Sequence, residues 1–505
     1  MRRANFKINY IVLFLIAGFS RILSAFWLPN MFGDAYVYIR DIGAISTKLK
    51  AGTFVLNDLY GFWLPLYQFV CAVINVFVGN GFYVGKIVSA IFGAGVCVLI
   101  YAITFQIVNH RTAALLAFGL IAFNPLHIAN SASAMTDIPH AFFVMASLLF
   151  VLRRRWVVAA VFAALAGFTR VESWMLIALI PLIQFWKERR VSYGALVIML
   201  AAPVFWFYVS ARATGDWLGC FRVRQQYHDW LLDQNPALAH FSFVSVLKDG
   251  GTFLVSTDIA VLIMTFAAVW LVWRFPQCSP EGAQSHNSRA TVPLLIFFFA
   301  FFVLLVGAYL THQQPIIFPR YGLILFSLGL PILVWVVLWS KQYRPDSWRK
   351  ILVSIVVLCV FDASVQLVGV AGELNRYKAE RTVADFLRDH FPPKAGQRIF
   401  CDDGTVRALS GIAPENFLTS ADGPHEHEAF WNFLTEKNVE YLVTTKTQGS
   451  LPTKLFPQSE YGEPIGVYES IMEAHSEFLF ANIHVYRRAS IVLFDSPRSA
   501  VFKVR

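Results

Sequence analysis

Long apolar stretches alternate with short basic segments over most of the chain. Several windows of about 20 apolar residues with almost no charge lie between Ile8 and Val370, and each is long enough to cross the hydrocarbon core of a bilayer. The first window follows Arg2 and Arg3, and no small-residue cleavage site comes after it, so it is predicted to be an uncleaved spanning helix. The pattern predicts a polytopic α-helical membrane protein.

The basic segments orient the predicted helices. Residues 153–155 and 187–190 are rich in arginine and lysine, which mark the cytoplasmic side of a membrane protein. With the N-terminus inside, the pattern predicts about eleven spanning helices. Residues 36–49 are predicted to form a helix on the outer surface. Residues 63–78 are predicted to be partly embedded from the outer side, because a full span there would reverse every later loop.

Three further segments complete the predicted topology. Residues 212–255 are polar and aromatic, and they are predicted to form a long external loop. Residues 112–128 and 256–273 are apolar and are predicted to be continuous spans. Arg21 and Lys86, near outer ends of spans, are expected to extend towards the interface.

The pattern changes after residue 370, where charge rises and apolar runs shorten. Helical periodicity and short β-rich runs alternate there, which is typical of a small α/β domain. The helices are predicted at residues 377–390 and 427–437, and the strands at 398–401, 441–444 and 483–486. The chain is therefore divided into a transmembrane domain, residues 1–370, and a small extracytoplasmic domain, residues 371–505.

Composition agrees with this membrane class. The 505 residues are 57% hydrophobic and only 15% charged, whereas about a quarter of a soluble protein is charged. The net charge of +10 gathers in short loops between apolar segments, so it does not indicate nucleic-acid binding. The six cysteines are scattered without a CxxC pair, so neither a disulfide framework nor a zinc site is indicated.

The predicted topology gathers ionisable and polar residues on the outer face. They are Asp34, Asp137, His140, Arg170, Glu172, His312, Arg320 and Tyr321. Each has a structural explanation: a solvated loop acid for Asp34, a cap of a helix starting at Pro139 for Asp137, a hairpin-tip ion pair for Arg170 and Glu172, and an interfacial anchor for Arg320. Their convergence on one face of an otherwise uncharged bundle favours a functional site.

This set of side chains suits sugar transfer from a lipid phosphate. A phosphate leaving group needs cations, and arginine meets phosphate oxygens with a planar fork. A hydroxyl or amine acceptor needs a carboxylate as base, and a lipid tail needs an apolar cleft between helices. We therefore expect a polyprenyl-phosphate sugar donor and a lipid, glycan or protein acceptor.

The sequence resembles the GT-C fold glycosyltransferases, in the group that holds protein O-mannosyltransferases and the aminoarabinose transferases of lipid A. The resemblance rests on Asp34, WLPLY at 63–67, TDIP at 136–139, GFTRVESW at 167–174 and PRY at 319–321. It implies that Asp34 activates the acceptor with support from Asp137. It also implies that Arg170 and Arg320, with Tyr321, hold the donor phosphate, and that Glu172, His140 and His312 support them.

The resemblance further implies an inverting reaction on the extracytoplasmic face of a bacterial inner membrane, with the C-terminal domain on the same side. A divalent metal shared by Asp34 and Asp137 is left open, because two acids without further ligands are a thin set. The alternative function is a transporter or lipid-linked-sugar flippase, which should show internal repeats and broken helices. No repeat is found in the sequence. A non-catalytic scaffold or sensor would need neither Asp34 nor Arg320.

Overall fold

The structure is a computed structural model of the whole chain. It describes residues 9–234, 240, 242–275, 291–314, 316–373, 377–391, 396–420, 422–445, 451–457, 459, 462–465, 467–476 and 481–488. The chain forms two compact units, residues 1–374 and 375–505. Residues 274–289 are predicted from the charge pattern to form an inner loop, and from residue 276 on they lie outside the described residues.

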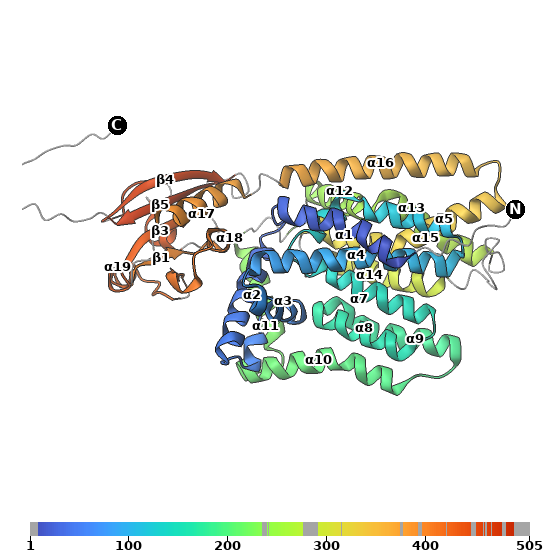
Figure 1. Cartoon of the computed structure of the whole chain (residues 1–505), viewed down its shortest axis with the longest axis horizontal. Helices are drawn as coiled ribbons and strands as arrows, with labels where there is room; N and C mark the ends of the chain where they lie inside the picture. Colours follow the sequence, from blue (N-terminus) through green and yellow to red (C-terminus); the bar gives the residue numbers. More distant parts are fainter. Residues whose placement is uncertain are drawn as a thin grey trace, which may run out of the picture. The chain divides into compact units, whose positions relative to one another are not determined.

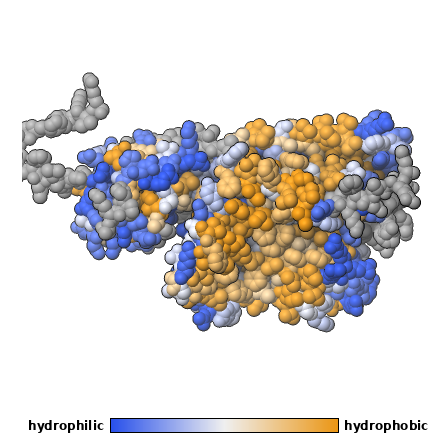
Figure 2. All heavy atoms as spheres, in the orientation of Figure 1, coloured by the Kyte–Doolittle hydropathy of each residue, from blue (hydrophilic) through white to orange (hydrophobic). Residues whose placement is uncertain are grey.

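The first unit is a bundle of helices that run roughly along one direction (Figure 1). Its long or apolar helices are α1 (Tyr10–Trp27), α4 (Gly81–Val108), α5 (Arg111–Ala122), α7 (Asp137–Leu152), α8 (Trp156–Thr169), α9 (Leu176–Glu188), α10 (Tyr193–Thr214), α13 (Ile259–Arg274), α14 (Val292–Leu310), α15 (Gly322–Tyr343) and α16 (Trp348–Glu373). Over this bundle a hydrophobic band separates hydrophilic residues at its two ends (Figure 2). That distribution fits a protein that spans a bilayer.

Fewer helices of the described structure meet the criteria for a membrane span than the sequence pattern predicts. Six described helices are long and apolar enough to cross a membrane, or up to eight if each of two bent pairs is one span. Three shorter apolar helices, among them α7 and α8, fall outside this count. The figure of about eleven spans therefore stays a prediction.

Further helices gather at one end of the bundle (Figure 1). They are α2 (Asp34–Ala51), η1 (Leu56–Leu59), α3 (Leu66–Val78) and α11 (Gly219–Gln234). A 13-residue helix such as α3 is about 20 Å long, which is less than the roughly 30 Å of a hydrocarbon core. The partial embedding of residues 63–78 stays a prediction, because α8 and α9 are similarly short.

The predicted span at residues 112–128 is broken, and this corrects the sequence analysis, whereas the predicted span at 256–273 is present as α13 apart from its first residues, where a second break lies. Helix α5 bends by 63° into α6 (Pro125–Ser131), and α12 (Phe243–Thr257) bends by 79° into α13. The second break falls at Asp258, whose φ of 71° no helix accepts. Residues 212–255, predicted to form an external loop, contain the helices α11 and α12, and their external position stays a prediction.

Arg21 and Lys86 do not extend towards the interface. Arg21 is fully buried, and its guanidinium donates to the carbonyl oxygens of Ile121 at 3.0 Å and Ala122 at 3.1 Å. These are carbonyls at the C-terminal end of α5, which lack helical partners where α5 breaks. Lys86 is also buried, and its ammonium donates to Leu28 O at 2.6 Å. Both cations satisfy backbone carbonyls inside the protein.

The second unit is a five-stranded sheet with helices. The strand order is β2-β1-β3-β5-β4, in which β2, β1 and β3 are parallel and β5 and β4 are antiparallel to their neighbours. The strands are β1 (Arg398–Cys401), β2 (Phe417–Leu418), β3 (Val439–Thr445), β4 (Tyr468–Ser476) and β5 (Ala481–Arg488). The helical elements are α17 (Lys378–His390), α18 (Gly404–Ser410), η6 (Pro414–Asn416), α19 (His427–Glu436) and α20 (Leu451–Leu455). The predicted α/β domain is confirmed, and all three predicted strands and both helices are present.

Candidate active site

Two loops that carry the predicted acids are bound to each other. The amide of Met31 donates to Ser133 Oγ at 3.0 Å, and the amide of Ala134 donates to the buried side chain of Asn30 at 2.9 Å. The first loop leads into α2, which begins at Asp34, and the second leads into α7. Loop pairing therefore brings the starts of α2 and α7 to one place.

Tyr38 fastens these two helices one turn further along α2. Its phenol and the hydroxyl of Thr136 form a buried hydrogen bond of 3.2 Å, directly before the start of α7. Its ring lies 4.8 Å from that of Trp63 and 5.7 Å from that of Tyr67, between ring centroids. The phenol of Tyr67 in turn donates to Gly85 O at 2.8 Å. The WLPLY segment thus supports α2 through aromatic packing.

Arg320 pairs with Asp34 across 286 positions of the chain. Its Nη2 donates to Asp34 Oδ2 at 2.7 Å, and the side chains are 9% and 37% exposed. The guanidinium carbon lies 4.8 Å from the ring centroid of Phe32, 5.2 Å from Phe318 and 5.3 Å from Tyr321. Aromatic faces attract the cation and hold its plane. Its Nε and Nη1 are buried without a hydrogen-bond partner among the described residues, so two donors remain available.

Arg170 joins two acids at the tip between α8 and α9. Its Nη1 donates to Asp137 Oδ1 at 2.7 Å, and its Nη2 donates to Glu172 Oε1 at 2.8 Å. Glu172 lies in η2 (Val171–Met175), outside the spanning helices. Burial acts to raise the pKa of the Glu172 carboxyl, but the Arg170 charge outweighs it and lowers that pKa to about 2. The hairpin-tip ion pair is confirmed, with Asp137 as an additional partner.

Tyr321 connects the two ion pairs. Its ring centroid lies 5.3 Å from the guanidinium carbon of Arg320 and 5.8 Å from that of Arg170. Both arginines therefore approach one aromatic ring, which lies in η5 (Pro319–Tyr321) at the start of α15. The order Asp34, Arg320, Tyr321, Arg170, Asp137 is thus a continuous chain of contacts.

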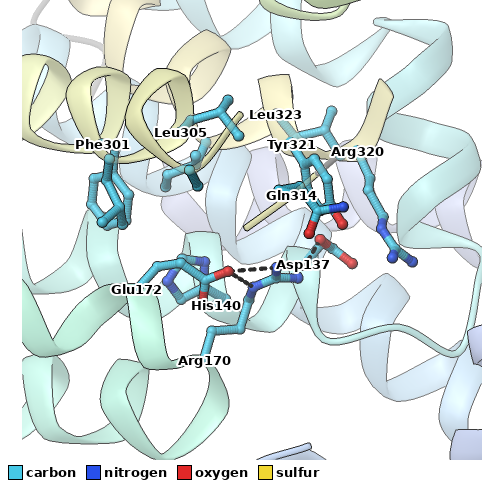
Figure 3. A pocket seen from close by; sticks show the side chains of 13 residues that line it. Asp137, His140, Arg170, Glu172, Phe301, Leu305, Gln314, Arg320, Tyr321 and Leu323 are labelled. Carbon is cyan, nitrogen blue, oxygen red and sulfur yellow. Dashed lines mark hydrogen bonds and ion pairs between the residues drawn. The ribbon is translucent and has the colours of Figure 1, made fainter. Parts of the chain in front are cut away.

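A cavity of about 100 Å³ opens beside this chain of contacts. Its polar lining comes from α7, the α8–α9 tip and η5, and its apolar wall comes from α14 and α15. Figure 3 shows Phe301 and Leu305 of α14 on one side and Arg170 on the other. The lining residues are Asp137, His140, Arg170, Glu172, Phe301, Leu304, Leu305, Ala308, Gln314, Arg320, Tyr321, Leu323 and Ile324. A polar end with an apolar wall suits an amphiphilic ligand.

Six of the eight predicted site residues line the cavity. Asp34 does not line it but is bound to Arg320, which does. His312 is displaced: it has a φ of 56°, it does not line the cavity, and its carbonyl oxygen lies 2.5 Å from Nε2 of His228. The capping role considered for Asp137 is wrong, because α7 begins at Asp137 itself and its Oδ2 is buried without a partner among the described residues.

Sequence reasoning missed Arg224 on α11. Its Nη2 donates to Phe62 O at 3.3 Å, and its guanidinium carbon lies 5.6 Å from the Phe62 ring centroid. It lies near enough to Glu172 and Arg170 to interact with both charges. The signal was available as an arginine on a polar helix, but interpretation of residues 212–255 as a loop concealed it.

The acids do not form a metal-ligand set. Asp34 is bound to Arg320, and Asp137 is bound to Arg170. Among the residues that the structure describes, no group of three or more His, Cys, Asp and Glu side chains could hold a metal ion. A divalent cation would have to displace an arginine from each acid, so the arrangement does not fit a metal shared by the two.

The fold is that of the GT-C glycosyltransferases, as the sequence resemblance predicted. Two solved structures show this over nearly the whole chain. The crystal structure of ArnT from Cupriavidus metallidurans bound to undecaprenyl phosphate is 14% identical, with a TM-score of 0.57, and covers 97% of this chain and 99% of its own. The apo structure of that protein is 14% identical, with a TM-score of 0.55, and covers 95% and 98%.

The sequence comparisons cover less of the chain. Residues 65–182 match the family model described as dolichyl-phosphate-mannose-protein mannosyltransferase. The matched segment contains Asp137, Arg170 and Glu172 but neither Asp34 nor Arg320. No curated protein sequence matches the chain.

Proposed function

We propose that this protein is a membrane glycosyltransferase that transfers a sugar from a polyprenyl-phosphate donor to a lipid, glycan or protein acceptor. The observation that carries the proposal is Arg320, a buried cation beside a carboxylate with two N–H groups that have no partner among the described residues. An arginine fork with free donors is suited to phosphate oxygens. The family match over residues 65–182 and the fold of ArnT support this assignment.

Arg320 makes the main phosphate contact in this proposal, and Arg170 mainly holds the two carboxylates that it binds. Arg170 already binds two carboxylates, so its positive charge is more than balanced. Arg320 binds one carboxylate with one of its N–H groups. Donor phosphate therefore binds to Nε and Nη1 of Arg320, next to Tyr321. Arg170 keeps Asp137 and Glu172 in place and adds its charge from the other side of the Tyr321 ring.

Asp34 acts on the acceptor. The acceptor hydroxyl or amine forms a bond to the anomeric carbon of the donor sugar, and the carbon–oxygen bond to the phosphate breaks. The acceptor proton passes to the Asp34 carboxylate, and the electron pair leaves with the polyprenyl phosphate, whose charge Arg320 stabilises. Attack on the face opposite the phosphate inverts the anomeric centre, as expected from the GT-C resemblance.

The reaction is placed at the outer face of a bacterial inner membrane, as the charge pattern of the loops predicts. The C-terminal unit is placed on the same side by the predicted topology. The apolar wall of α14 and α15 is suited to the first isoprene units of the donor, because a lipid chain entering from the bilayer needs an apolar lining.

The two broken spans are a feature expected of a transporter, the alternative function. In transporters, the free backbone groups at such breaks coordinate substrate or ions. Here the carbonyls at the end of α5 accept hydrogen bonds from Arg21, and the amide of Ile259 at the start of α13 donates to Asp362. Side chains of the protein thus occupy these groups, which favours the enzyme.

The test is turnover by Asp34→Asn in purified protein. Release of undecaprenyl phosphate is measured from a panel of undecaprenyl-phosphate hexoses and pentoses. We expect Asp34→Asn to lose at least about a hundredfold of the turnover, in keeping with loss of a general base, while binding of undecaprenyl phosphate is retained. Asp41→Asn, which alters an acid of an exposed ion pair on the same helix, is the control. Near wild-type turnover by Asp34→Asn would remove Asp34 from the mechanism.

A further inference from the structure

Helix α16 exposes mainly apolar side chains, but its buried side carries two polar residues. Its exposed large residues are Val353, Val356, Val357, Val360, Phe361, Val365, Leu367 and Val368. Its buried residues include Asp362 and Gln366, one helical turn apart. A carboxyl group and an amide inside a membrane domain are costly unless they meet partners, so their contacts show what they do.

Asp362 and Gln366 bind the two backbone groups exposed by the break between α12 and α13. The amide of Ile259, the first residue of α13, donates to Asp362 Oδ2 at 2.7 Å. The side-chain amide of Gln366 donates through Nε2 to Val255 O, in the last turn of α12, at 2.7 Å. Helix ends leave such groups without helical partners, and water is excluded here. The two side chains of α16 therefore close both sides of the break.

The same buried side of α16 reaches the other broken span. Gln366 Oε1 accepts from the side-chain amide of Asn124 at 2.8 Å. Asn124 caps α6, because its Oδ1 accepts from the amide of His127 at 2.8 Å. One glutamine thus connects the end of α12 to the start of α6.

The carboxyl groups of Asp258 and Asp362 lie close enough to interact electrostatically. Asp258 is buried and is itself the residue at the break. Its Oδ1 accepts from the amide of Val261 at 3.2 Å. Cys359, one turn before Asp362, lies near enough to Asp258 to interact with its charge.

The break lies directly behind the arginine of the active site. A Cβ on Gly322 would clash with Ser256 Oγ and lie 2.7 Å from the Ser256 carbonyl carbon, so α12 contacts the backbone of Gly322 with no space between them. Gly322 begins α15 and follows the η5 turn that carries Arg320. A shift of the last turn of α12 must therefore move this turn.

We propose that Asp362 and Gln366 are positioning residues that hold the α12–α13 break and, through Ser256 and Gly322, keep Arg320 against Asp34. The consequence for donor binding rests on the proposed function, but the positioning itself does not. Asparagine at position 362 retains the contact, because its side-chain oxygen can accept from the amide of Ile259. Leucine retains the volume and loses this hydrogen bond.

The experiment compares full-length variants in nanodiscs without ligand. Hydrogen–deuterium exchange is measured for the segment 316–324. We expect Asp362→Leu and Gln366→Met to raise exchange there by at least about tenfold, as loss of a buried hydrogen bond to a helix end allows. Asp362→Asn and the outward-facing control Val357→Leu should exchange like wild type. Unchanged exchange in Asp362→Leu and Gln366→Met overturns the proposal, and Gln366→Met decides alone if Asp362→Leu does not fold.

A second readout separates this inference from the proposed function. Binding of undecaprenyl phosphate is titrated for the same variants. We expect at least about tenfold weaker binding by Asp362→Leu and Gln366→Met, and wild-type binding by Asp362→Asn. If wild type does not bind the lipid while the exchange results hold, the proposed function fails and the positioning role stands. If wild type binds and all variants bind equally, Arg320 does not depend on the break.

Discussion

Replacement of Arg320 by methionine isolates the phosphate-binding charge from the packing of the side chain. Methionine is flexible and packs well against aromatic rings, so it fills the space among Phe32, Phe318 and Tyr321. Methionine has no N–H donor, so it loses both the hydrogen bond from Nη2 to Asp34 and the two donor nitrogens, Nε and Nη1, that have no partner among the described residues. The variant therefore tests the donors and the charge.

The magnitude follows from the two free donors. Each hydrogen bond to a charged group contributes about 1.5–3 kcal/mol, and taking the lower value for both gives about 3 kcal/mol. Since 1.4 kcal/mol is tenfold, undecaprenyl phosphate should bind Arg320→Met about a hundredfold more weakly than wild type. Arg320→Lys keeps the charge but not the fork, so we expect a loss of about tenfold. Asp34 is 37% exposed, so water can replace its lost partner, and folding should change little.

The assay is a titration of detergent-purified protein with undecaprenyl phosphate, accompanied by thermal unfolding. Arg40→Ala is the matched control, because Arg40 lies on α2 with Asp34 but forms an exposed pair with Asp41. Binding by Arg320→Met within about twofold of wild type refutes the argument that the free N–H groups receive a phosphate. A large fall in unfolding temperature with unchanged binding would make Arg320 a structural residue.

Two further predictions concern pH and topology. The pKa of Glu172 is lowered from an ordinary value of 4.5 to about 2, so its pairing with Arg170 stabilises the protein fully above pH 4.5 and is lost as the pH falls towards 2. The difference in unfolding temperature between wild type and Glu172→Gln should be constant from pH 7 to 5 and shrink below 4.5; a difference that widens in acid contradicts this. Glu436 is 75% exposed in the C-terminal unit, so Glu436→Cys, in a background without native cysteines, should react with a membrane-impermeant maleimide in intact spheroplasts. Labelling only after lysis reverses the predicted topology.

Local signals in the sequence were sufficient for the elements that depend on local chemistry. Apolar length predicted the membrane bundle, and alternation with turn residues predicted β1, β3 and β5 within a few residues of their observed ends. Motifs around Asp137 and Arg170 predicted two residues that prove to be bonded to each other. These two lie at the start of α7 and the end of α8, which pack side by side as a helical hairpin, so short-range connectivity favours their meeting.

Tertiary structure decided which charges are paired and which are free. The sequence determined that Asp34 and Arg320 each border an apolar helix, but their bond joins positions 286 residues apart and depends on how α2 packs against η5. The burial of Arg21, the break at Asp258 and the contacts of Gln366 were invisible for the same reason. Each satisfies or exposes backbone groups of another helix, and in a water-free interior such groups find partners wherever packing places them, irrespective of distance along the chain.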